Sequence, residues 1–141
     1  MLIKLKNNFN LIFIFFFVFF ITSFFSKLGV DSHHDGAVFK PALDVLEGKI
    51  LFRETFTYYG ALATYINAFS LFLFGKYLLV IRLTAAFFYS LTAVFLWLIY
   101  KKFLNRKLTY LSIGLWVLLA PYYAQIFLPW PSIYSTFFLT L

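Results

Sequence analysis

The chain has 141 residues, of which 63% are hydrophobic and 25% aromatic, while only 12% are charged. A soluble domain has about 25% charged residues, and a chain this short cannot bury so much apolar surface in water. The composition excludes an ordinary soluble domain, a disordered chain and, without Cys, a disulfide scaffold. We expect an all-α, multi-pass transmembrane helical protein. Its net charge of +7 is then typical of residues that set membrane orientation, and no nucleic-acid partner is expected.

The first predicted span covers about residues 9–26, an apolar run that follows Lys4 and Lys6. A helix of about 18–20 residues crosses a hydrocarbon core of ~30 Å. A cleaved signal peptide is the alternative, but the stretch 22–25 lacks the small residues of a cleavage site. We therefore predict an uncleaved span with the N-terminus in the cytoplasm.

An external loop is predicted over 27–77, with two amphipathic helices near the membrane surface at about 37–47 and 61–74. Pro41 is placed in the first turn of the first helix, and Gly48 is expected to end it as a left-handed cap. Lys40 and Asp44 can pair along this helix, four residues apart. Asp44 and Glu47 are expected on its solvated face.

The second surface helix, 61–74, is short for a span and carries a polar stripe. The stripe consists of Thr64, Asn67 and Ser70. A confident span follows at 78–100, and four cations come directly after it: Lys101, Lys102, Arg106 and Lys107. Such a cluster belongs on the cytoplasmic side, which favours a topology in which 61–74 lies at the outer surface instead of crossing.

The chain is predicted to return outward over 108–128, where Pro121 should kink or end the helix. An interfacial aromatic belt is expected from Tyr122, Tyr123, Phe127 and Trp130. A further span begins at 132–141, and because a helix does not end in hydrocarbon, we expect a single, incomplete membrane domain of a longer protein.

The candidate site is the acidic loop. All five acidic residues lie between Asp31 and Glu54, and Asp31, His33, His34 and Asp35 form its most polar stretch. A carboxylate here can accept a proton from a nucleophile, and a helix N-terminus favours phosphate. In the alternative, Asp35 is only an N-cap and Asp31 a solvated loop residue. Neighbouring histidines diverge, so no metal site is predicted, although a divalent metal stays open as a cofactor.

Two further positions have competing interpretations. Arg82 either snorkels to the outer interface or shares a site face with Ala86, Tyr89 and Ala93. Glu54 either pairs with Arg53 at the surface, where such pairs contribute little, or belongs to a binding site.

A series of short motifs runs in order through residues 9–125. It comprises Asp35-Gly36, Ala42 to Lys49, Leu51 to Glu54, Tyr59 to Leu62, Leu73 to Gly75, and Arg82. In order and spacing this series resembles the start of the GT-C-type membrane glycosyltransferases, which include protein mannosyltransferases and lipid A aminoarabinose transferases. Where that family has an acidic pair, often Asp-Glu, this chain has His34-Asp35.

The resemblance implies the N-terminal part of a glycosyltransferase that moves a sugar from a polyprenyl-phosphate carrier to an acceptor at the outer face of a bacterial plasma membrane. It implies catalytic roles around Asp35, with Asp31 and His34, and substrate contacts from Arg82, Glu54, His33 and Tyr59. The expected partners are the lipid-linked donor and membrane lipids; the sugar and acceptor are not specified. A transporter half or an export-complex subunit is the non-enzymatic alternative.

Overall fold

The computed structural model describes residues 2–124 and 129–141, and all regular secondary structure there is α-helical. The helices are α1 (Leu2–Phe25), α2 (Ser32–Leu46), α3 (Ala61–Phe74), α4 (Leu78–Tyr100), α5 (Arg106–Ala124) and α6 (Pro131–Thr140). The all-α expectation is therefore confirmed.

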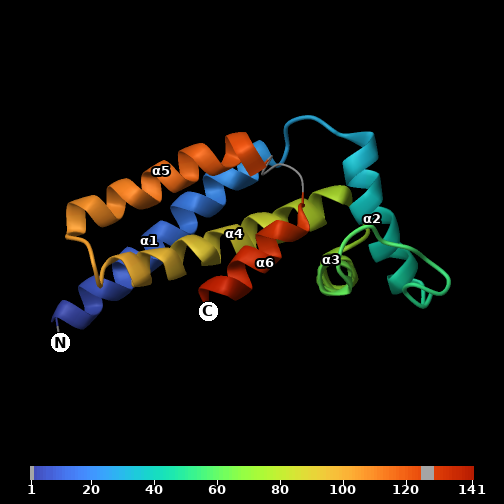
Figure 1. The fold of residues 1–141 in the computed structure, drawn as a ribbon, viewed down its shortest axis with the longest axis horizontal. Helices are drawn as coiled ribbons and strands as arrows, with labels where there is room; N and C mark the ends of the chain where they lie inside the picture. Colours follow the sequence, from blue (N-terminus) through green and yellow to red (C-terminus); the bar gives the residue numbers. More distant parts are fainter. Residues whose placement is uncertain (1, 125–128) are drawn as a thin grey trace.

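Helix α4 is the centre of the molecule, and α1, α5 and α6 pack along it. These four helices follow the long axis in Figure 1, whereas α3 is seen end-on and thus crosses that axis. Helices α2 and α3 pack on each other beside the first turns of α4. The start of α1 and the α4–α5 link lie at the opposite end.

Small residues on α4 allow α1 to approach closely. Ala85, Ala86 and Ala93 are fully buried, and Ala85 and Ala93 share the main core with Ile14 and Val18 of α1. The four residues proposed to share one face of α4 are all buried: Arg82, Ala86, Tyr89 and Ala93. The far side of α1 is instead an exposed row of phenylalanines: Phe13, Phe16, Phe17, Phe20 and Phe24.

Helix α2 begins five residues earlier than the expected 37, because Asp31 and not Asp35 is its N-cap. Pro41 therefore lies inside the helix and not in its first turn. An interior proline removes one helical hydrogen bond, at a typical cost of ~3 kcal/mol or more; its ring is buried here. The end is as predicted: Gly48 has φ +90°, and its N–H donates to the Val45 carbonyl oxygen.

Helix α3 has the predicted bounds, and it turns its polar stripe toward the protein. Thr64, Asn67 and Ser70 are all buried, and Asn67 Oδ1 accepts a hydrogen bond of 2.6 Å from the Tyr134 hydroxyl of α6. The opposite face is an exposed apolar surface made of Leu62, Tyr65, Phe69, Phe72, Leu73 and Phe74.

Among the described residues, only α4 is long and apolar enough to cross a membrane by itself. The apolar stretches Phe9–Phe25 and Ala61–Phe74 are shorter. Helix α5 continues through Pro121 to Ala124, so the proline does not end it. The belt expected from the side chains of Tyr122, Tyr123 and Phe127 lies outside the described part of the chain.

Candidate functional site at the α2–α4 end

A buried ion pair joins the first turn of α2 to the first turns of α4. Arg82 Nε donates to Asp35 Oδ1 over 3.1 Å, and Arg82 Nη2 donates to Asp35 Oδ2. The two residues are 3% and 2% exposed. A paired, planar fork of this kind is the strongest geometry for an arginine–carboxylate contact. The snorkelling interpretation of Arg82 is therefore wrong, because its head group points into the protein.

The same guanidinium also holds the segment between α1 and α2. Arg82 Nη1 donates to the carbonyl oxygens of Ser26, at 3.0 Å, and Gly29, at 2.8 Å. Gly29 has φ +67°, a conformation that glycine adopts without penalty. Arg82 thus joins the end of α1, the following loop and α2 to α4. Its guanidinium was expected to bind a carrier phosphate, but these donors already bond to protein oxygens.

Asp31 and His34 form a second pair at the start of α2. Asp31 Oδ1 accepts hydrogen bonds from the backbone N–H groups of His33 (3.1 Å) and His34 (3.0 Å), and Asp31 Oδ2 lies 2.8 Å from His34 Nδ1. These contacts, led by the His34 backbone N–H, lower the pKa of Asp31 below its usual value. Asp31 is therefore the N-cap of α2, and its side chain stays 40% exposed, as expected of a solvated residue.

The two pairs are directly connected, because the backbone N–H of Asp31 donates to Asp35 Oδ2 over 2.9 Å. The structure therefore brings together four of the predicted site residues: Asp31, His34, Asp35 and Arg82. Only the Asp31–His34 pair is open to solvent, with 40% and 37% of its side chains exposed.

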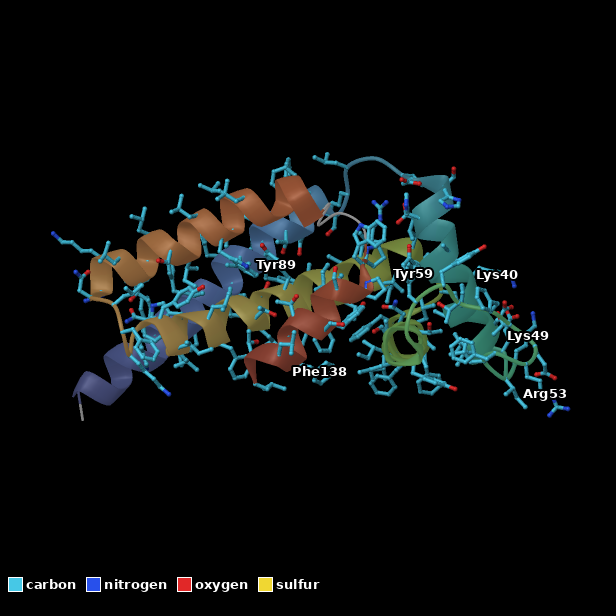
Figure 2. All side chains as sticks on the ribbon, in the orientation of Figure 1. Lys40, Lys49, Arg53, Tyr59, Tyr89 and Phe138 are labelled. Carbon is cyan, nitrogen blue, oxygen red and sulfur yellow. The ribbon has the colours of Figure 1, made fainter. Side chains whose placement is uncertain are left out.

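Aromatic residues from distant segments border His34. The His34 ring lies 4.9 Å from the Trp130 ring, and the Trp130 ring lies 5.7 Å from that of Tyr59. Figure 2 shows Tyr59 at the end of the bundle near α2 and α3. From the sequence, Trp130 is expected in an aromatic belt and in a short external turn between Pro129 and Pro131, without a contact to His34.

A pocket of about 240 Å³ opens beside these rings, between the start of α3 and α6. Its lining residues are Gly60, Leu62, Ala63, Pro131, Tyr134, Ser135 and Phe138. Two of these lining residues, Gly60 and Pro131, directly follow Tyr59 and Trp130 in the chain.

His33 and Glu54 stand apart from this arrangement. His33 is exposed, and its ring packs edge-to-face with the His34 ring at 5.1 Å. Within the described residues, no group of three or more His, Asp or Glu side chains is placed to hold a metal ion. Glu54 is exposed and accepts the Ile50 N–H over 2.8 Å, in a separate turn at 50–55.

That turn is anchored to the other end of α2 by Asp44. Asp44 is only 5% exposed and contacts Lys40 Nζ (2.5 Å), Lys49 Nζ (2.6 Å) and Thr55 Oγ1 (2.8 Å). The predicted Lys40–Asp44 pair is confirmed, but the solvated position of Asp44 is wrong. Figure 2 shows Lys40, Lys49 and Arg53 at this end of the molecule. Nine residues of helix, about 13 Å, separate Asp44 from Asp35.

Comparison of the chain with protein-family models, with curated proteins and with solved structures found no match. The site is therefore interpreted from its own geometry.

Proposed function

We propose that the chain is an integral membrane protein whose α2–α3 end faces outward. The cluster Lys101, Lys102, Arg106 and Lys107 lies at the end of the bundle that also holds the start of α1 (Figure 1). Basic residues concentrate on the cytoplasmic side of bacterial plasma membranes. The crossing direction of α3 fits a helix that lies in the outer interface, with its apolar face toward lipid.

On this basis we propose that the chain is the N-terminal part of a glycosyltransferase that moves a sugar from a polyprenyl-phosphate carrier to an acceptor at the outer face. One observation carries the proposal. The motif series that resembles GT-C-type enzymes includes Asp35 and Arg82, which are 47 residues apart, and these two side chains bond directly. Motif positions that meet in space support a common site.

The pocket next to the site supports an amphiphilic ligand. Leu62, Ala63 and Phe138 provide apolar lining, and Ser135 adds a hydroxyl. Ligand pockets combine largely apolar walls with a few polar groups, and a sugar attached to a prenyl chain has both characters.

A transfer assay with the complete protein tests the proposal. Vesicles containing the protein receive a panel of labelled polyprenyl-phosphate sugars in the outer leaflet, and release of free polyprenyl phosphate is measured. We expect turnover of at least one donor above empty vesicles. Correctly inserted protein that turns over none of them would favour the non-enzymatic alternative, a transporter half or an export-complex subunit.

A further inference from the structure

The proposed transfer needs a group that accepts the proton of the acceptor hydroxyl, and Asp35 is badly placed for this. Its Oδ1 accepts from Arg82 Nε, and its Oδ2 accepts from Arg82 Nη2 and from the Asp31 N–H. With 2% of the residue exposed, no acceptor hydroxyl reaches either oxygen. Asp35 is therefore a positioning residue, and the proton must go elsewhere.

His34 has the geometry that Asp35 lacks. An ionised carboxylate only accepts hydrogen bonds, so the 2.8 Å contact with Asp31 Oδ2 requires the proton on His34 Nδ1. A neutral His34 then carries a free lone pair on Nε2. Asp31 is itself fixed, since its Oδ1 caps α2 through two backbone N–H groups. The Trp130 ring lies 4.9 Å from the imidazole, and the next residue in the chain, Pro131, lines the pocket.

We infer that His34 Nε2 is the proton acceptor of the reaction and that Asp31 sets its tautomer; the inference rests on the proposed transferase function. The acceptor oxygen forms a bond to the anomeric carbon of the sugar while the bond from that carbon to the carrier phosphate oxygen breaks. The hydroxyl proton moves to Nε2, the carrier leaves as polyprenyl phosphate, and His34 returns the proton to water.

The tautomer is tested first, because it does not depend on activity. His33 and His34 are the only histidines of this chain, so His33→Gln leaves a single imidazole in it for ¹⁵N NMR with segmental labelling. We expect the neutral ring to carry its proton on Nδ1. In Asp31→Asn the side-chain oxygen can still cap α2, and the amide NH₂ then faces Nδ1 as a donor, which forces the proton onto Nε2. An Nε2-protonated ring in the His33→Gln protein would overturn the inference.

The transfer assay is the second test. His34→Gln and Asp31→Asn should each lower turnover by about 10²–10⁴-fold with little change in KM, since general-base catalysis typically contributes that factor. Glu47→Gln, at an exposed position to which no site role is assigned, is the control and should retain activity. Full activity of His34→Gln would overturn the inference and leave the transferase proposal intact. Absence of wild-type turnover with every donor would count against the transferase proposal, whereas the NMR result judges the Asp31–His34 pair independently.

Discussion

The buried Asp35–Arg82 pair is expected to make a large contribution to the stability of the site. A buried pair is costly to break on one side only, because the remaining charge stays buried without a partner. Asp35→Asn should therefore destabilise the protein by about 3–5 kcal/mol, a typical loss for such a site. Thermal unfolding in detergent measures this loss.

Arg82→Gln combined with Asp35→Asn should recover part of the loss, because no unpaired charge then stays buried; the shorter Gln still leaves the Ser26 and Gly29 carbonyl oxygens without their donor. Glu54→Gln is the control, since Glu54 is exposed and a surface change usually stays within about 0.5 kcal/mol. Losses that simply add in the double variant would show that the two residues are not coupled.

Asp44 makes a pH-dependent contribution to stability. Hydrogen bonds from Lys40, Lys49 and Thr55 hold its pKa well below the usual value of 3.8. A depressed folded-state pKa means that the contribution is complete above about pH 4 and is lost only as the pH falls through the folded-state value. Asp44→Asn should unfold more easily at neutral pH and depend less on pH during acid unfolding. Glu47→Gln, which alters an exposed 3.6 Å pair with Lys76, should leave the acid profile unchanged.

At the scale of elements, Gly36 inside α2 and Gly48 just after its end should respond to alanine in opposite ways. Gly36 lies inside the helix with nothing within 4 Å of an added Cβ, so Gly36→Ala should stabilise the protein by about 0.5–1 kcal/mol. Gly48 has φ +90°, where an L side chain is strained, so Gly48→Ala should destabilise it by about 1–2 kcal/mol. Equal shifts in unfolding temperature for the two variants would contradict the cap geometry.

The sequence predicts elements well where the signals are local. The bounds of α3 and α4 follow from apolar runs interrupted by Gly75 and Lys76, and the end of α2 follows from Gly48. The start of α2 was misplaced because the polar stretch before Gly36 has no helical periodicity. Its N-cap is recognisable only from the two N–H groups that Asp31 accepts.

The residue types of the site could be predicted from the sequence, but not the contacts between them. The acidic loop and Arg82 are visible in the sequence, but their contact joins residues 47 positions apart. Burial of Asp44 depends on a chain reversal that returns Lys49 and Thr55 to it. Trp130 lies against His34 although the two are 96 positions apart in the chain (130 − 34), and periodicity within one element carries no information about such contacts.

At the scale of the whole molecule, the proposed orientation has a direct test. Because the chain has no cysteine, single cysteines can be introduced at two exposed positions, Ser32 and Asn105. Ser32→Cys should react with a membrane-impermeant thiol reagent in intact cells, and Asn105→Cys only after the membrane is opened. Reaction of Asn105→Cys in intact cells would reverse the orientation and make α3 a span.

The threefold attachment of Arg82 also has a consequence for synthesis. Ser26, Gly29 and Asp35 leave the ribosome well before residue 82 is made, so the segment after α1 emerges without the cation that fixes its shape. The α1–α2 segment therefore acquires its final form only after Arg82 of α4 has been made. A helix that is synthesised later, α4, therefore fixes the shape of a loop that is synthesised earlier.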